Sequence, residues 1–154
     1  MIQMKSIKIN SYAKVNIGLK ILNKRSDGYH NISTVFQEID LFDSITISKF
    51  NGPLKFSSNV DWLQNDQNNL CVIAYNYIKN LYKIGGANIV LKKNISRGSG
   101  LGSGSSNAAT IMKGLREIYN LKVTDNELIK IGSRIGADVP FFINGSTQVG
   151  EGIG

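Results

Sequence analysis

Residues 98–106, with the sequence GSGLGSGSS, form the segment of this chain that is best suited to chemistry. Alternate glycines leave backbone N–H groups accessible and allow positive φ angles, so such a segment can wrap around an anion. A helix that begins near Ser105 would add N–H groups without partners and the positive end of its dipole. Lys92, Lys93 and Arg97 precede the segment and add positive charge. We therefore predict a site for a di- or triphosphate.

Two common phosphate-binding motifs do not describe this segment. A P-loop needs a lysine directly after its last glycine, and no glycine of the segment is followed by lysine. A dinucleotide-binding fingerprint needs a third glycine, which would fall on Ser103, Ser105 or Asn107. A flexible linker or a simple helix-entry turn is the alternative interpretation.

Asp138 is a candidate general base, in a loop between a predicted helix and an apolar stretch. Pro140 should hold Val139 extended and so help to fix this loop. Taken alone, an aspartate here is more typical of a turn in which the carboxylate bonds its own backbone. Lys14 and the pair Tyr29–His30, taken singly, are likewise more typical of a solvated surface.

Strands are expected to position Lys14 and the residues near it. Residues 13–21 alternate between apolar and polar side chains, as in a half-buried strand, with Lys14 and Asn16 on the face away from the core. The expected core face consists of Ala13, Val15, Ile17, Leu19 and Ile21. Residues 32–40 and 44–48 predict two more strands, joined through residues 41–43.

Helices should flank the glycine-rich segment. The spacing of apolar residues predicts a helix over 70–81, capped by Asp66, Asn68 or Asn69 and ended by Gly85–Gly86, and a second helix over 108–118. Between them, residues 87–93 predict a strand that leads into the glycine-rich segment. A capping box of Thr124 and Glu127 predicts a third helix that Gly136 ends.

The last part of the chain is expected to be a hairpin. Residues 141–143 form an apolar run that predicts a strand, and Asn144–Gly145 is a turn signal. Residues 146–150 should then return antiparallel to 141–143. Residues 1–150 are predicted to form one domain, and residues 151–154 the start of a connection.

Composition excludes several classes of protein. The chain has 154 residues, 42% hydrophobic and 19% charged, with a formal net charge of +7, and no apolar run reaches the length of about 18 residues needed to span a bilayer. A single cysteine, Cys71, cannot form an internal disulfide, which with the absence of a recognisable secretory signal predicts a cytoplasmic protein. The positive charge favours an anionic partner, whether nucleic acid, anionic lipid or a phosphorylated small molecule.

Four motifs together resemble the GHMP small-molecule kinases: residues 13–16 (AKVN), 27–30 (DGYH), 98–108 (GSGLGSGSSNA) and 136–140 (GADVP). The second motif is similar to members of that family that phosphorylate 4-diphosphocytidyl-2-C-methyl-D-erythritol. The resemblance implies an α+β fold of the ribosomal protein S5 domain 2-like type. It also implies that a C-terminal ferredoxin-like domain, present in family members, is absent here, so that the chain is a truncated or N-terminal portion.

The resemblance further implies a role for each motif. Asp138 would take the proton from the substrate hydroxyl, and Lys14 would hold that carboxylate ionised and orient the hydroxyl. Tyr29 would stack on the cytosine, with His30 at the edge of the base and Asn16 near the methylerythritol. Ser105 and Ser106 are tentative Mg²⁺ ligands. The residues expected at ATP are Asn69, Leu70, Gly98, Gly100, Leu101, Gly102, Ser103, Gly104, Ser105 and Ser106.

The expected function is therefore ATP-dependent phosphorylation of the 2-hydroxyl of the cytidyl substrate, in non-mevalonate isoprenoid precursor synthesis, with ATP and Mg²⁺ as cofactors and neither nucleic acid nor membrane as partner. Ser96 departs from the family, which usually carries proline there. Two alternatives stay open: a catalytically silent nucleotide-binding fragment and, less favoured, a basic RNA-binding module. The sequence leaves the oligomeric state open.

Overall fold

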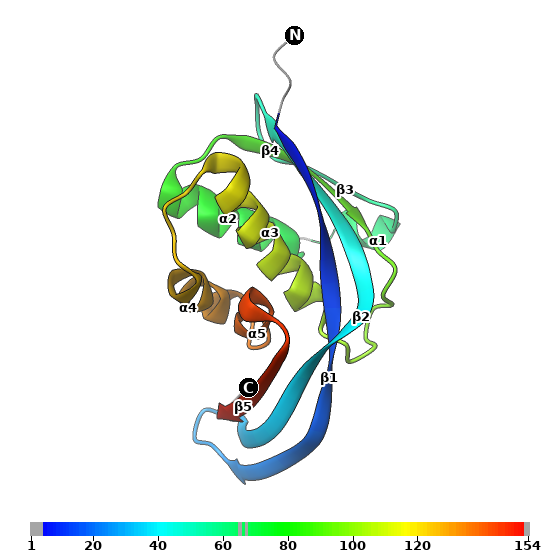
Figure 1. Cartoon of the computed structure of the whole chain (residues 1–154), viewed down its shortest axis with the longest axis vertical. Helices are drawn as coiled ribbons and strands as arrows, with labels where there is room; N and C mark the ends of the chain where they lie inside the picture. Colours follow the sequence, from blue (N-terminus) through cyan, green and yellow to red (C-terminus); the bar gives the residue numbers. More distant parts are fainter. Residues whose placement is uncertain (1–4, 65, 67, 153–154) are drawn as a thin grey trace.

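A layer of helices covers one face of a five-stranded sheet in the computed structural model, which describes residues 5–64, 66 and 68–152 (Figure 1). The α+β class is confirmed. In chain order the elements are β1 (Ser6–Lys24), β2 (His30–Phe50), β3 (Lys55–Ser58), α1 (Asp61–Gln64), α2 (Leu70–Tyr82), β4 (Gly86–Lys92), α3 (Ser103–Tyr119), α4 (Asp125–Ile135), α5 (Val139–Asn144) and β5 (Thr147–Gly152).

The strand β2 organises the sheet, because it changes partner along its length. It pairs with β1 between residues 30 and 48, while residues 44–50 pair with β4 and residues 32–37 with β5, all antiparallel. The prediction of two strands joined at 41–43 was wrong, since β2 continues through this stretch. The register shifts between Tyr12 and Ala13 of β1, because two residues of β2, Asp40 and Leu41, pair with no residue of β1. These two residues form a β-bulge in β2.

Beyond this bulge, β1 and β2 project as an arm, and β5 pairs with β2 along part of it (Figure 1). The prediction that alternate residues of β1 face the core was therefore wrong beyond the first residues of that series. Ala13 is fully buried, but Ile17, Leu19 and Ile21 are more than half exposed. Alternation sets which side chains share a face of a strand, but it does not say how far a covering layer extends over that face.

The three predicted helices are confirmed. Asn69 caps α2 by accepting from the N–H of Cys71, and Thr124 and Glu127 form the capping box of α4. The helix α2 ends at Tyr82 with Lys83 in the left-handed conformation, so Gly85–Gly86 does not end it and Gly86 belongs to β4. The sequence pattern missed β3 and α1.

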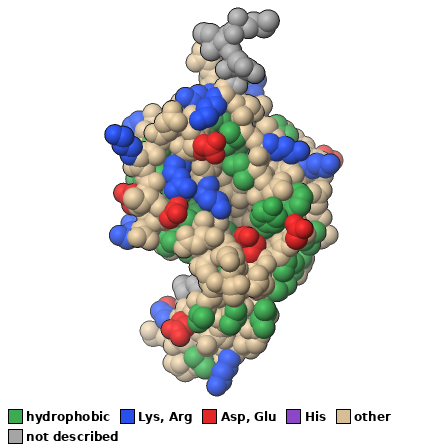
Figure 2. Space-filling view, in the orientation of Figure 1, with side chains coloured by type: hydrophobic (Ala, Val, Ile, Leu, Met, Phe, Trp, Pro, Cys, Tyr) green, Lys and Arg blue, Asp and Glu red, His purple; other side chains and the backbone are tan. Residues whose placement is uncertain are grey.

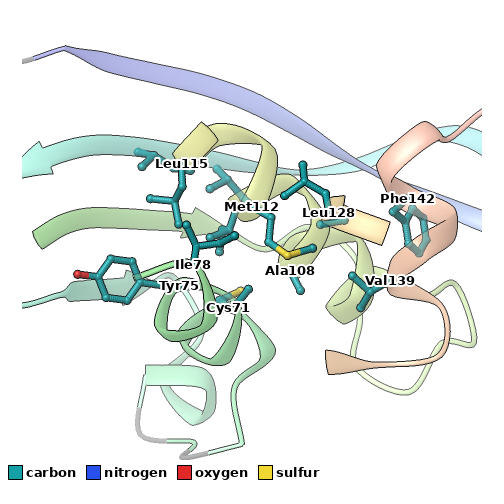
Figure 3. Close-up of a cluster of buried hydrophobic side chains, with 14 of the residues drawn as sticks. Cys71, Tyr75, Ile78, Ala108, Met112, Leu115, Leu128, Val139 and Phe142 are labelled. Atoms are coloured by element: carbon teal, nitrogen blue, oxygen red, sulfur yellow. The ribbon is translucent and has the colours of Figure 1, made fainter. Parts of the chain in front are cut away.

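The core lies between the helices and the sheet, with α3 at its centre (Figure 3). Its labelled side chains come from α2, α3, α4 and α5, so one hydrophobic cluster holds all of these helices together. The fully buried members with the largest side chains include Tyr75, Ile78, Ile111, Met112, Leu115, Ile118, Leu128 and Val139.

The predicted hairpin at the end of the chain was wrong. Residues 139–144 form the short helix α5, with Pro140 in its first turn, and β5 pairs with β2 instead of with this segment. An apolar run of this length fits a buried helix as well as a buried strand. Proline suits the start of a helix, so Val139 is helical and not extended as expected.

Candidate active site

The glycine-rich segment, here called the glycine loop (residues 98–102), leads from β4 into α3. Gly98, Gly100 and Gly102 all have φ between +69° and +75°, as the alternation of glycines predicted. The first turn of α3 leaves N–H groups without helical partners, and Gly102 at the N-cap has no side chain to accept from them. These donors border a pocket of about 400 Å³, within the range of small-molecule sites.

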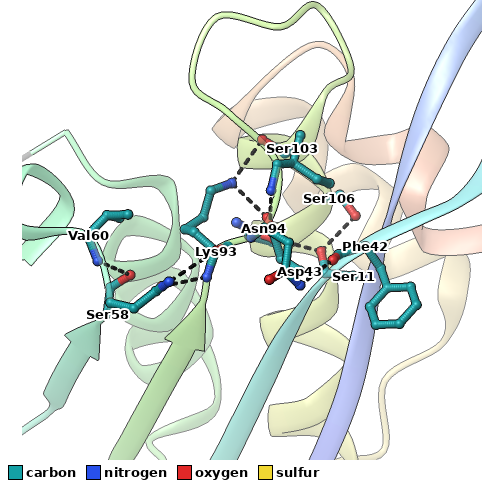
Figure 4. Close-up of polar contacts among 12 residues, drawn as sticks. Ser11, Phe42, Asp43, Ser58, Val60, Lys93, Asn94, Ser103 and Ser106 are labelled. Carbon is teal, nitrogen blue, oxygen red and sulfur yellow. Dashed lines mark hydrogen bonds and ion pairs between the residues drawn. The ribbon is translucent and has the colours of Figure 1, made fainter.

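A buried ion pair fixes the entry to this loop (Figure 4). Asp43 on β2 is fully buried, and its Oδ2 accepts from Nζ of Lys93 at 2.6 Å. Its Oδ1 accepts from the backbone N–H groups of Asn94 and Ile95 at 2.7 and 2.9 Å. Lys93 also donates to the hydroxyl of Ser103, the first residue of α3, at 2.9 Å. The chain before the loop and the helix after it are therefore tied to the same carboxylate.

The loop also packs directly against β1. The N–H of Lys14 donates to the carbonyl of Leu101 at 3.0 Å. A Cβ on Gly102 would lie 2.9 Å from Phe142 and 3.2 Å from the Lys14 side chain, and the positive φ of Gly102 disfavours other residues. Glycine is thus required here both by conformation and by close approach.

Lys14 and Asp138, far apart in the sequence, form an ion pair beside this contact. Nζ of Lys14 lies 3.5 Å from Oδ2 of Asp138. The Lys14 side chain is 7% exposed and that of Asp138 is 35% exposed, so the carboxylate reaches solvent while the ammonium is enclosed. Asp138 is at the N-cap of α5 but makes no cap hydrogen bond. The turn-aspartate interpretation therefore fails, and its carboxylate remains available as an acceptor.

Neighbouring groups enclose the Lys14 ammonium. It donates to Oδ1 of Asn16 and lies 4.8 Å from the centroid of the Phe36 ring, in a cation–π contact. Lys14 is therefore buried rather than solvated, and the structure brings Asn16, predicted at the substrate, into the same cluster as the two predicted catalytic residues.

The two predicted Mg²⁺ ligands have different environments. Ser105 lines the pocket. Ser106 is 2% exposed, and its hydroxyl shares a 2.8 Å hydrogen bond with Ser11, whose own hydroxyl donates to Asn107 (Figure 4). Among the described residues no cluster of three or more His, Cys, Asp and Glu side chains could hold a metal ion.

The start of α2 forms another wall of the pocket. Asn69 and Leu70, whose role at ATP stays a prediction, both line it, and the Asn69 side chain caps α2 and donates to the carbonyl of Leu63. Cys71 also lines the pocket, but burial raises the pKa of its thiol to about 12. A thiol with that pKa stays protonated at neutral pH and is a poor nucleophile.

Tyr29 and His30 lie away from this pocket, at the tip of the arm. Both are exposed, Tyr29 by 62%, and neither is among the residues that line the pocket. Arg25 and Asp27 pair across the same turn, and the N–H of Tyr29 donates to the Asp27 carboxylate, which shapes the DGYH motif. The predicted site is thus divided between the pocket, the Lys14–Asp138 pair and the arm.

Sequence reasoning missed Asp43 and Trp62. Asp43 lies in a stretch that was interpreted as a joint between strands, and its role depends on contacts about fifty residues away. Trp62 lines the pocket from α1, which the pattern did not predict. A lone tryptophan in a polar stretch was a signal that could have been noticed.

Comparison with known proteins identifies the family of this chain. A family model described as the GHMP kinases N terminal domain matches residues 69–146, which run from the cap of α2 through the glycine loop to the turn before β5. The chain belongs to the GHMP kinase family. The matched range includes Asp138 and all glycines of the loop.

Two relatives within the GHMP kinases are similar to this chain over nearly all of its length. A 4-diphosphocytidyl-2-C-methyl-D-erythritol kinase of Clostridium beijerinckii is 42% identical over 149 residues, which cover 96% of this chain and 53% of that kinase. A kinase of the same name from Francisella tularensis is 43% identical over 157 residues, covering 100% of this chain and 57% of the relative. The chain thus spans about half the length of the curated relatives that it matches.

Solved structures agree with the GHMP kinase fold. A crystal structure of 4-(cytidine 5'-diphospho)-2C-methyl-D-erythritol kinase matches 96% of this chain and 53% of its own, with a TM-score of 0.82 and 34% identity. The mevalonate kinase of Methanococcus jannaschii matches with a TM-score of 0.71 at 19% identity, which shows a shared fold alone. In the part of the chain that the structure describes, no helix has the length and apolar character to cross a membrane.

Proposed function

We propose that this chain carries the ATP-binding loop and the catalytic base of a kinase that phosphorylates the 2-hydroxyl of 4-diphosphocytidyl-2-C-methyl-D-erythritol, a step of non-mevalonate isoprenoid precursor synthesis. The observation that carries the proposal is the Lys14–Asp138 ion pair, at 3.5 Å, next to the point where Lys14 contacts the glycine loop. Relatives with the name of this activity support the choice of substrate.

The proposed chemistry assigns a task to each group. Backbone N–H groups of the loop and of the first turn of α3 bind the ATP phosphates. Asp138 accepts the proton of the substrate hydroxyl while the hydroxyl oxygen bonds to the γ-phosphorus of ATP. The bond between the γ-phosphorus and the ADP oxygen breaks, and ADP leaves. Lys14 lies beside both the carboxylate and the loop, where its positive charge offsets the negative charge that gathers there. Phosphoryl transfer depends mainly on such positioning and charge stabilisation.

Mg²⁺ fits this site only as an ion held largely by phosphate oxygens and water. The described residues that line the pocket offer the hydroxyl groups of Ser99, Ser103 and Ser105 and one carboxylate, that of Asp66, rather than a carboxylate cluster. Mg²⁺ commonly keeps several waters and binds substrate phosphates in kinase sites. We propose Ser105 as the protein ligand of the ion, because the buried hydroxyl of Ser106 is engaged in its hydrogen bond with Ser11. When bound, the ion would neutralise phosphate charge.

Tyr29 and His30 are proposed to recognise the cytidyl group, since an exposed aromatic ring on an arm can stack on a base. The acceptor in this proposal is a small molecule. The exposed position of both side chains leaves them free to bind it, whereas groups in the core already have partners.

The proposal is tested first by ATP binding to the chain itself, measured by calorimetry. Gly102→Val should abolish detectable binding, because its side chain would clash with Phe142 and Lys14 and deform the loop. Gly18→Val is the matched control, since Gly18 also has a positive φ but lies on the arm with open space around it. ATP affinity that is unchanged in Gly102→Val would exclude the glycine loop as the phosphate site.

Phosphoryl transfer is tested in a fusion of residues 1–152 to the remaining half of the Clostridium beijerinckii kinase, with product detected by mass spectrometry. We expect phosphorylated cytidyl substrate and ADP in equal amounts. ATP hydrolysis without a phosphorylated product would contradict the proposed acceptor while leaving the ATP site intact.

A further inference from the structure

Lys113, on α3, is a half-buried lysine that the proposed chemistry does not use. Its ammonium donates to the carbonyl of Phe142 at 2.9 Å and to the carbonyl of Ile143 at 3.5 Å. Both carbonyls belong to the last turn of α5, where the carbonyl groups of a helix have no partners within the helix. A side chain of α3 thus caps the C-terminal end of α5.

The cation and this helix end stabilise each other. Burial lowers the pKa of the Lys113 ammonium, and the charges of Glu38 and Asp125 counter that effect. An ammonium that leaves water needs acceptors in the protein to offset the cost in free energy. The carbonyls of α5 supply such acceptors, so the position of Lys113 and the position of α5 depend on one another.

A second donor holds the same end of α5. Nε2 of Gln148, on β5, donates to the carbonyl of Phe141 at 2.9 Å and to the carbonyl of Gly145 at 2.7 Å. The strand β5 is paired with β2, where Gln148 lies opposite Phe36. Because α5 has only six residues, few hydrogen bonds of its own stabilise it. Donors from α3 and β5 therefore fix the C-terminal end of this helix.

The other end of α5 carries the proposed catalytic base. Asp138 is the N-cap of α5, and its carboxylate lies 3.5 Å from Nζ of Lys14. Asp138 and Phe142 are about one helical turn apart, and Pro140 restricts the backbone between them. A shift of the C-terminal end of so short a helix would move the Asp138 carboxylate as well.

We infer that Lys113 is a positioning residue of the kinase reaction, which holds α5 so that the Asp138 carboxylate faces Lys14 and the substrate hydroxyl. This inference rests on the proposed function, because it assumes that Asp138 is the base. The glycine loop has a separate attachment, through Asp43 and Lys93, so ATP binding should depend less on Lys113 than catalysis does.

The first test measures kinetics in the fusion described above. Lys113→Met removes the donors but keeps an unbranched side chain, and should lower kcat at least about tenfold with little change in the KM for ATP, since small displacements of a reacting group are costly. Lys113→Arg keeps N–H donors and should retain most of the activity. Arg116→Met is the matched control and should leave kcat unchanged. Arg116 also extends from α3, but it donates to the carbonyl of Val123 and to Asp125 rather than to α5.

Combining Lys113→Met with Asp138→Asn separates positioning from a general loss of stability. If Lys113 acts through the base, the combined variant should have the kcat of Asp138→Asn alone. A further tenfold fall in that background would overturn the inference. A folded Lys113→Met variant with the kcat of the wild type would also overturn it, as would an equal loss in Arg116→Met.

Amide hydrogen exchange of the chain itself, measured by NMR, provides a readout that needs no activity. The N–H of Gly145, which donates to the carbonyl of Phe141, should exchange faster in Lys113→Met than in the wild type, and at the wild-type rate in Arg116→Met. Unchanged exchange throughout α5 in Lys113→Met would overturn the inference. A wild-type fusion that transfers no phosphate would contradict the proposed function and with it the role of Lys113 in catalysis, whereas the exchange rates would still show whether Lys113 holds α5.

Discussion

The two ends of the β1–β2 ribbon contain similar alternating sequences but have opposite environments. At the end beneath the helices, Ser11 and Asp43 are fully buried, and each makes hydrogen bonds with defined partners. On the arm, the apolar side chains of Ile17 and Ile21 are more than half exposed, and Figure 2 shows hydrophobic side chains on its surface. The arm turn carries an ion pair that is open to solvent.

The buried end and the exposed end of the ribbon are suited to different tasks. Under the helices, burial makes every polar contact specific, because an unpaired buried group costs free energy. On the arm, side chains remain free to meet a ligand. Lys14 and Asp138 lie at the boundary, with the ammonium enclosed and the carboxylate partly open. This boundary is where a group can be both held rigidly and reached by a substrate.

The strongest test of this contrast compares two ion pairs. Asp43→Asn leaves the Lys93 ammonium buried without its anion and should lower the free energy of unfolding by about 3–5 kcal/mol. Asp27→Asn on the arm, where the pair is exposed, should change stability by less than urea denaturation resolves. Replacing both partners, as Asp43→Asn with Lys93→Met, should recover part of the loss. Similar effects at the two sites would remove the basis of the comparison.

At the boundary, the expected effect is on catalysis. In the fusion described above, Asp138→Asn should lower kcat at least about 100-fold with ATP binding retained, because the proton acceptor is lost. Lys14→Met, which keeps most of the buried volume, should lower kcat by a similar factor. Since the two residues act as a unit, the double variant should be little worse than either single one. Fully additive losses would show that they act independently.

On the arm, the expected effect is smaller and concerns binding. Tyr29→Ala should raise the KM for the cytidyl substrate about tenfold, with a smaller change in kcat, since one stacking contact is lost. Thermal stability should not change, because the ring is largely exposed. Leu22→Ala serves as control on the same arm. A drop in kcat alone would contradict a role in recognition.

The smallest expected effect is on the free energy of unfolding and concerns α4, which is not part of the β1–β2 ribbon. Thr124→Ala removes the cap of α4 and should lower the free energy of unfolding by about 1 kcal/mol. The Thr124 N–H and hydroxyl hold the pKa of Glu127 below its usual value. Glu127 therefore stabilises the fold at neutral pH, and this contribution is lost as the pH falls below its unfolded pKa, about 4.3. Urea denaturation between pH 7 and pH 3 should show a weaker acid dependence in the variant.

Local signals in the sequence determine much of this protein by themselves. The glycine loop with its positive φ angles, the three long helices, the Asn69 cap and the Thr124–Glu127 capping box all depend on residues close together in the chain. The family resemblance rested on the same kind of short motif, and the match over residues 69–146 confirms it.

Only the tertiary structure determined the features that depend on contacts between residues far apart in the sequence. The pairing of β5 with β2, the helical state of residues 139–144 and the exposure of the arm follow from which layer covers which face, and alternation carries no such information. The same holds for the site. Only folding places Lys14 at 3.5 Å from Asp138, turns Ser106 toward Ser11 and brings Trp62 against Arg97, because each contact joins elements whose spacing in sequence says nothing about their spacing in the fold.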